Sequence, residues 1–307
     1  MLIYKLRFGW WNAALSPSAP QAGSNASDET YPLVCKHIKS LLTEKSCDFL
    51  ALSEVSSKDI NHFINAIDIE NITILDMAEK VGKTRFDIAV IYNNKKLKVK
   101  HISNLSKSIT GNIVKAAQIV EVINIDDSKI FYIYLCHWAS RLNGGEEKRN
   151  ASASMVYQSA MDYIQNDKDV IILGDFNDNP YDRSLNVNLQ ASRCHDAVRK
   201  YPNEFFYNPF WRTIVSEKKY SHLEPMQAYP SGSHKYKTFQ GTIWHSYDQA
   251  IVSGSLISGG RWCLNEYETN IISSTDILND YSSSKCFIDH LPIVCEITRT
   301  EGVAHVS

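Results

Sequence analysis

Side chains that can bind a metal or move a proton stand beside apolar, strand-like segments at six places in the chain. The six places are Trp10-Trp11-Asn12, Leu52-Ser53-Glu54, Leu135-Cys136-His137, Gly174-Asp175-Phe176-Asn177, Tyr247-Asp248 and Ile288-Asp289-His290. A single Asp, Asn or His in such a position usually caps a turn or lies on the surface. Six positions rich in Asp, Asn, Glu and His instead favour strand ends that converge at one edge of a sheet, where rigid sites are built.

These residue types suit metal-assisted attack on a phosphate ester. Mg²⁺ prefers oxygen ligands and commonly takes one or two carboxylates, with water and substrate phosphate completing its shell. The sequence has no Cys/His ligand cluster that would favour zinc. Hydrolysis of a phosphodiester also needs a base for the attacking water, groups that stabilise the phosphoryl oxygens, and help for the leaving oxygen.

The elements that must position these residues alternate between strands and helices. Strands are predicted at 2–8, 48–54, 72–76, 87–92, 114–123, 130–136, 170–175, 249–253 and 293–297, and helices at 31–45 and 145–166. We found no internal repeat and no Pro/Gly/Ser-rich linker between two cores. The pattern therefore predicts one α/β domain over residues 1–300 with a short tail at 301–307, although it does not give the strand order.

Composition and charge describe an ordinary globular chain. The 307 residues carry 32 basic and 34 acidic side chains, a net charge of 32 − 34 = −2, with 44% hydrophobic residues. The longest apolar run, 130–136, is far shorter than the roughly 20 residues that span a bilayer. Residues 1–8 lack the apolar core of a signal peptide, and the seven cysteines include no C-x-x-C pair. We expect a reduced, cytoplasmic protein with no membrane association and no obligate protein partner.

The segment 201–247 has a distinct composition, with 12 of the chain's 33 aromatic residues and a local charge of 5 − 3 = +2. Basic residues interleaved with aromatics suit a surface that binds nucleic acid, with Lys235 and Lys237 as candidate phosphate ligands. The alternative is a structural insertion, whose own aromatic side chains would attach it to the core. Arg141 is a further candidate, because its planar guanidinium can clamp phosphate, although a solvated surface role is equally consistent with the sequence.

The order of the six motifs resembles the endonuclease/exonuclease/phosphatase superfamily, which has the DNase I-like fold. The most specific pieces are Gly-Asp-Phe-Asn at 174–177 and Asp-His-Leu-Pro at 289–292, and the resemblance extends over residues 3–298. The stretches His137-Trp-Ala-Ser-Arg141 and Tyr207-Asn-Pro-Phe-Trp211 are similar to a bacterial branch. The resemblance implies a four-layer α/β sandwich, in which two packed mixed β-sheets are flanked by helices and the site lies at one edge.

The resemblance also implies a metal site and its chemistry. Glu54 matches the main ligand of Mg²⁺ or Mn²⁺, Asn12 would lie beside the metal or the scissile phosphate, and Asp289 is a second metal contact. These three residues form the implied metal site.

Five further residues match catalytic positions of the superfamily. Asp175 would orient or deprotonate the attacking water, and Asn177 would bond to the phosphate. His290 would stabilise the phosphoryl oxygens while Asp248 fixes its imidazole. His137 would protonate the leaving 3′-oxygen.

We therefore expect a metal-dependent phosphodiesterase that acts on nucleic acid, with an intracellular DNA endonuclease as the first hypothesis. Ala14 stands where relatives active on apurinic sites carry Asp, which argues against abasic-site repair. Because the superfamily includes inositol-lipid phosphatases and sphingomyelinases, the alternative is hydrolysis of a small or lipid phosphoester. A non-catalytic nucleic-acid-binding protein is a third hypothesis, which the intact set of candidate ligands disfavours.

Overall fold

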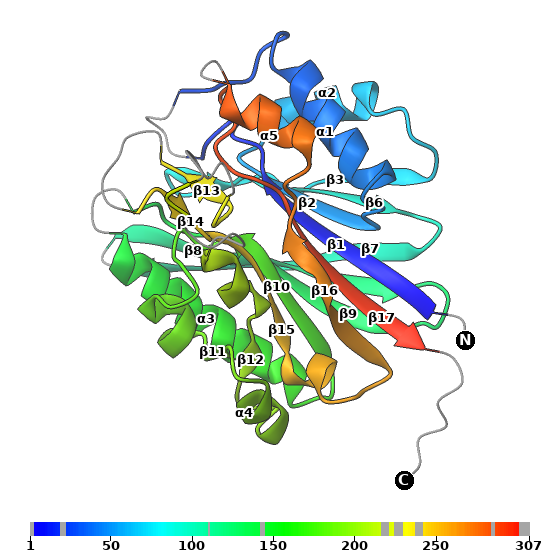
Figure 1. Ribbon diagram of the computed structural model, residues 1–307, viewed down its shortest axis with the longest axis vertical. Helices are drawn as coiled ribbons and strands as arrows, with labels where there is room; N and C mark the ends of the chain where they lie inside the picture. Colours follow the sequence, from blue (N-terminus) through cyan, green and yellow to red (C-terminus); the bar gives the residue numbers. More distant parts are fainter. Residues whose placement is uncertain are drawn as a thin grey trace.

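The computed structural model describes residues 3–18, 23–109, 111–141, 145–215, 221–223, 230–236, 242–283 and 286–300. Its strands form two large mixed sheets that pack face to face (Figure 1). In order across the first sheet, the strands are β16 (Trp262–Ile271), β17 (Ile293–Thr300), β1 (Ile3–Asn12), β2 (Phe49–Ser53), β6 (Ala89–Asn93) and β3 (Ile72–Asp76). Across the second they are β11 (Ala191–Ser192), β12 (Phe206–Tyr207), β15 (Asp248–Ser253), β10 (Asp169–Asp175), β9 (Ile130–His137), β8 (Asn112–Asn124) and β7 (Leu97–Ile109).

Helices cover the outer faces of both sheets. The first sheet carries α1 (Tyr31–Thr43), α2 (Ser57–Ala66) and α5 (Thr275–Ser282), and the second carries α3 (Glu146–Ile164) (Figure 1). The short helix α4 (His195–Lys200) lies beside β11 and β12, with Val198 in the core between the sheets. Two short hairpins, β4 (Glu79–Val81) with β5 (Thr84–Phe86) and β13 (His234–Lys235) with β14 (Trp244–His245), stand apart from the sheets. The expected four-layer α/β sandwich is confirmed. No helix among the described residues has the length and apolar character needed to cross a membrane.

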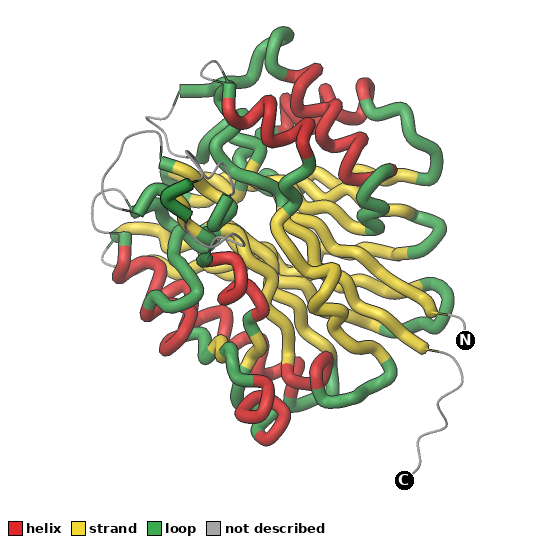
Figure 2. Tube along the Cα trace, viewed as in Figure 1, coloured by secondary structure: helices red, strands yellow, loops and turns green. Residues whose placement is uncertain are grey.

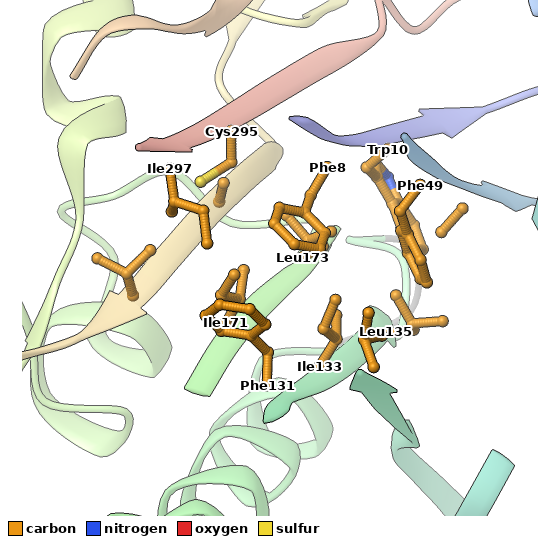
Figure 3. Close-up of a cluster of buried hydrophobic side chains, with 14 of the residues drawn as sticks. Phe8, Trp10, Phe49, Phe131, Ile133, Leu135, Ile171, Leu173, Cys295 and Ile297 are labelled. Carbon is orange, nitrogen blue, oxygen red and sulfur yellow. The ribbon is translucent and has the colours of Figure 1, made fainter. Parts of the chain in front are cut away.

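Alternating side chains of β1 show how the layers are held together. Phe8 and Trp10 point into the core between the sheets, whereas Trp11 lies in a second core beneath α1 and α2. All three side chains are fully buried. Figure 3 shows Phe8, Trp10 and Phe49 of the first sheet facing Phe131 of the second. Because a strand with both faces covered is apolar at successive positions, the predicted buried strands stand out in the sequence.

Several elements differ from those predicted. β1 continues to Asn12, four residues beyond the expected end, because Trp10 and Trp11 extend the strand into the first polar motif. The sequence analysis missed α2, which begins at a capping box formed by Ser56 and Asp59. It also missed the edge strands β7 and β16, whose half-exposed, largely polar residues give a weak apolar pattern.

The register of the central strands brings the polar strand ends together. Asp175 at the end of β10 lies opposite His137 of β9 on one side and Asp248 of β15 on the other. Gly174 permits this approach, since a Cβ atom there would lie 2.3 Å from the backbone oxygen of Cys136. In the first sheet, Asn12 pairs with Ser53, the residue before Glu54. Many loops gather at the end of the sheets away from the two termini (Figure 2).

Candidate active site

Asp248 and His290 form a buried acid–imidazole pair. Nδ1 of His290 lies 2.7 Å from Oδ2 of Asp248, while Oδ1 of Asp248 accepts a hydrogen bond of 3.0 Å from the indole Nε1 of Trp10. Burial alone would lower the pKa of His290, but the carboxylates of Asp248 and Asp175 raise this pKa well above its usual value. The two carboxylates therefore favour the protonated imidazole, whose Nε2 lies 3.7 Å from Oδ2 of Asp175.

Asp175 is held between two asparagine residues. Its Oδ2 accepts a hydrogen bond of 3.1 Å from Nδ2 of Asn12, and its Oδ1 accepts one of 3.0 Å from the backbone N–H of Asn177. Oδ1 of Asn12 accepts from the backbone N–H of Ala14 at 3.0 Å, which fixes the orientation of the amide. Asn177 adopts a left-handed backbone conformation with φ of 52° and donates from Nδ2 to the backbone oxygen of Trp138.

His137 belongs to a second acid–imidazole pair, whose acid the sequence analysis missed. Nδ1 of His137 lies 3.0 and 3.1 Å from the two carboxylate oxygens of Asp87. Although burial would lower it, the Asp87 carboxylate raises the pKa of His137 to about 9. Against its own burial, the pKa of Asp87 is held below its usual range by His137 and Lys115. Asp87 stands immediately before the apolar run of β6, a placement that resembles those of Asp248 and Asp289.

Glu54 lies beside the second pair. It follows β2 in a left-handed conformation with φ of 55°, and its Oε1 is 3.7 Å from Nε2 of His137. Burial raises the pKa of Glu54; the Asp87 carboxylate adds to this shift, while His137, His290 and Asn12 oppose it. A bound dication would favour the ionised form of this carboxylate.

The oxygen donors around Glu54 fit a hard divalent ion. The Glu54 carboxylate matches the small number of protein oxygen ligands that Mg²⁺ takes, with water and substrate filling the remaining positions. Asn12 offers a second oxygen, Oδ1, which already accepts one hydrogen bond from the backbone of Ala14. The described residues also contain two groups whose ligand atoms lie within 4.8 Å of one another: Asp175, Asp248 and His290, and His234, Asp289 and His290. In the first group, both Asp248 oxygens already accept hydrogen bonds, so this group is better suited to holding an imidazole than an ion.

The remaining predicted residues have different surroundings. Asp289 precedes His290 and is half-buried. Nη2 of Arg141 pairs with Asp178 at 2.9 Å and with Asp182 at 2.7 Å, so the charge of its guanidinium is already balanced. Lys235 is exposed on β13, with its Nζ 5.6 Å from the ring centroid of Trp244. Lys237 lies outside the described residues.

The described parts of the segment 201–247 have two different environments. Phe206 and Tyr207 form β12 and pair with β15, and Tyr207 and Phe210 belong to the core between the sheets. The β13–β14 hairpin instead flanks the site, where the ring centroid of His234 lies 4.5 Å from that of His290. Burial lowers the pKa of His234 to about 3, and the charge of His290 acts in the same direction.

The sequence profile of the endonuclease/exonuclease/phosphatase family matches residues 32–285. The chain belongs to this family. Its members are metal-dependent phosphoester hydrolases, and the resemblance drawn from the sequence motifs is thereby confirmed. No curated protein matches the sequence.

Solved structures share the fold at low sequence identity. The catalytic domain of human Nocturnin with bound sulfate matches with a TM-score of 0.61 and 16% identity, covering 96% of this chain and 95% of that chain. Mannosyl-6-phosphatase Bt3783 of Bacteroides thetaiotaomicron matches with a TM-score of 0.55 and 13% identity over 95% and 99%. TDP2 of D. rerio in complex with a single-strand DNA product matches with a TM-score of 0.55 and 12% identity over 96% and 99%.

Proposed function

We propose that the protein is a Mg²⁺- or Mn²⁺-dependent phosphodiesterase that cleaves nucleic acid, acting as a DNA endonuclease. The observation that carries this proposal is the pair of acid–imidazole units, Asp248–His290 and Asp87–His137, beside Asp175 and Glu54. Two protonated imidazoles near a hydrogen-bonded carboxylate suit cleavage of an ester with a poor leaving group. One stabilises the phosphoryl oxygens and the other protonates the leaving oxygen.

Each residue then has a defined task. Asp175, oriented by Asn12 and the backbone of Asn177, accepts the proton of the attacking water. His290 donates from Nε2 to a phosphoryl oxygen, and Asp248 keeps a proton on Nδ1. Glu54 and Asn12 would hold a divalent ion, with Asp289 as a proposed further contact, and the ion would supply positive charge to the phosphoryl oxygens.

His137 completes the proposed reaction on the leaving-group side. Its Nδ1 is bonded to Asp87, which leaves Nε2 directed toward Glu54 and available to donate a proton to the 3′-oxygen. An imidazole with a pKa of about 9 is protonated at neutral pH, as a general acid must be.

DNA is the favoured substrate for two reasons. The hairpin that flanks His290 carries an exposed Lys235 against Trp244, a combination that suits phosphate and base contacts. A structural relative, TDP2, has been captured with a single-strand DNA product. Because another relative is a mannosyl-6-phosphatase, a small phosphoester is the second candidate.

The test is to offer three substrates side by side: supercoiled plasmid, inositol phosphates and bis(p-nitrophenyl) phosphate, each with Mg²⁺, Mn²⁺ or EDTA. The proposal predicts metal-dependent nicking of the plasmid and no such nicking by the His290→Ala variant. Hydrolysis of the inositol phosphates without plasmid cleavage would instead support the second candidate. A folded protein that binds DNA and hydrolyses none of the three would be a non-catalytic binding protein.

A further inference from the structure

A cleft of about 580 Å³ is lined by Glu54 and His137, and His290 is not among its lining residues. The turn between β4 and β5 and the turn between β7 and β8 form two of its walls. The loop after β9 and the first turns of α3 form the others. The cleft therefore adjoins the imidazole assigned to the leaving oxygen.

The cleft is positively charged. Three lysines, Lys83, Lys115 and Lys148, line it, and Glu54 is the single carboxylate among its lining residues. Lys83 and Lys148 are exposed, and neither forms an ion pair with any other residue that the structure describes. Two unpaired ammonium groups that line one cleft are well placed to bind an anion.

Lys115 connects this cleft to the catalytic pair. Its side chain is mostly buried and donates to Oγ of Ser18 at 3.1 Å and to the backbone oxygen of Arg85. Its Nζ also lies 3.8 Å from Oδ1 of Asp87, the acid that holds His137. Lys115 thus has a structural role in the wall, whereas Lys83 and Lys148 remain available for a ligand.

The direction of the reaction indicates which part of a substrate would lie here. In an in-line displacement the attacking water and the leaving oxygen are on opposite sides of the phosphorus. Asp175 and His290 act on the water and the phosphoryl oxygens, and His137 acts on the leaving oxygen. With these proposed roles, the group that departs lies on the His137 side of the phosphorus, next to the cleft that His137 lines.

We propose that Lys83 and Lys148 bind a second phosphate, carried by the leaving group itself. This inference rests on the proposed function and narrows its substrate to a strand that continues with a phosphate upstream of the leaving 3′-oxygen. A polynucleotide has such a phosphate at every internal linkage, whereas a simple phosphomonoester has none. Because phosphate contacts carry no base information, the cleft would select a continuing strand and not a sequence.

Two dinucleotides that differ by one phosphate provide the test. The thymidine dinucleotide TpT has one internal phosphodiester, and pTpT adds a 5′-phosphate to the nucleoside that leaves. We expect wild-type protein to cleave the internal linkage of pTpT with a kcat/KM on the order of tenfold above that for TpT, since two charge-assisted contacts are added. In Lys83→Ala/Lys148→Ala the ratio falls toward one. Lys98→Ala, an exposed lysine on β7 away from the cleft, keeps the wild-type ratio.

A binding measurement without catalysis separates the two proposals. In EDTA, fluorescence anisotropy with a single-stranded 12-mer gives the slope of log Kd against log salt. Loss of the contact to this one phosphate should reduce the magnitude of the slope by about 0.7, the value per neutralised phosphate for single strands. A wild-type protein that cleaves neither dinucleotide contradicts the proposed function, while the slope still tests the cleft. Equal rates on TpT and pTpT, or a slope that is the same in the double variant and Lys98→Ala, would overturn the inference.

Discussion

The two acid–imidazole pairs share a geometry but differ in what surrounds them. In each, Nδ1 faces a buried carboxylate and Nε2 lies 3.7 Å from a second one, Asp175 for His290 and Glu54 for His137. His290 is enclosed: Trp10 bonds to its acid, and the ring of His234 lies 4.5 Å from its own ring. His137 instead lines an open cleft with three lysines.

This difference indicates a division of labour. An imidazolium locked on both sides is suited to a fixed electrostatic task, because its position changes little as charge develops on the phosphoryl oxygens. An imidazolium that borders an open cleft is suited to exchanging a proton with a group that must then depart. The residues that surround the two imidazoles therefore differ, although the exposed fractions of the two side chains, 11% for His137 and 8% for His290, are close.

The largest loss of activity is expected for a substitution of Glu54, because the metal that we propose it holds would act together with both acid–imidazole pairs. Glu54→Gln should lower kcat/KM on DNA on the order of a thousandfold at limiting Mg²⁺, because a neutral amide is a poor ligand for a hard dication. High Mn²⁺ should restore part of the loss. Steady-state rates across a metal titration measure this, with the exposed Glu70→Gln as control. Wild-type rates for Glu54→Gln at limiting Mg²⁺ would remove the metal assignment.

The second largest loss of activity is expected for substitutions at Asp175 and in the enclosed pair, Asp248 and His290. Asp175→Asn and His290→Ala should each cost about a hundredfold or more in kcat, through loss of the base and of the electrostatic contact. Asp248→Asn should resemble His290→Ala, because the carboxylate acts through the imidazole. The Asp248→Asn/His290→Ala double variant should be little slower than the slower single variant, as residues that act as one unit are non-additive. A strongly additive loss would show that the pair does not work as a unit.

Leaving-group chemistry separates the open pair from the enclosed one. His137→Ala should lose about a hundredfold on DNA and far less on a p-nitrophenyl diester, whose leaving group departs without a proton. His290→Ala should lose activity on both substrates. Equal losses for His137→Ala on the two substrates would mean that His137 does not act as the acid.

The pH profile also tests His137 as the general acid, and the expected effect is smaller. A general acid works while it is protonated, so activity should fall as pH rises through the pKa of His137, which is about 9 in the metal-free protein. Asp87→Asn removes the charge that raises this pKa, and the alkaline limb of kcat/KM should therefore move to lower pH. An unmoved limb in Asp87→Asn would assign it to another group.

The smallest effect is expected in the hairpin beside the enclosed pair. Lys235→Ala/Lys237→Ala should raise KM on DNA with little change in kcat, and Lys235 alone should account for about one unit of the log–log salt slope. Lys98→Ala is again the control. A lower melting temperature with an unchanged salt slope would indicate that the segment supports the fold without contacting substrate.

The local sequence predicts which residues belong to this site better than it predicts which of them pair with one another. Asn12, Glu54, Asp175 and His290 are recognisable because each adjoins an apolar run that forms a buried strand. Asp87 follows the same rule, yet its pairing with His137 joins positions 50 residues apart and depends on how the two sheets pack.

The cleft depends even more on tertiary structure. Lys83 and Lys148 come from a hairpin turn and a helix that no periodicity connects, and only the assembled sandwich brings them to one cleft. Arg141 shows the reverse case: its sequence context suggested a phosphate clamp, and the fold supplies Asp178 and Asp182 as partners. The partner of a charged loop residue depends on how whole layers pack together, and short-range sequence patterns do not encode that packing.

Trp10 belongs at once to the core between the sheets and to the hydrogen bonds of the active site. Its indole donates to Asp248 at 3.0 Å and is fully shielded from solvent. Its emission should therefore respond to the charge on the neighbouring carboxylate and imidazole and not to bulk water. The difference spectrum between the native protein and Trp10→Phe would then provide an intrinsic optical signal of the protonation state of His290, without an added dye.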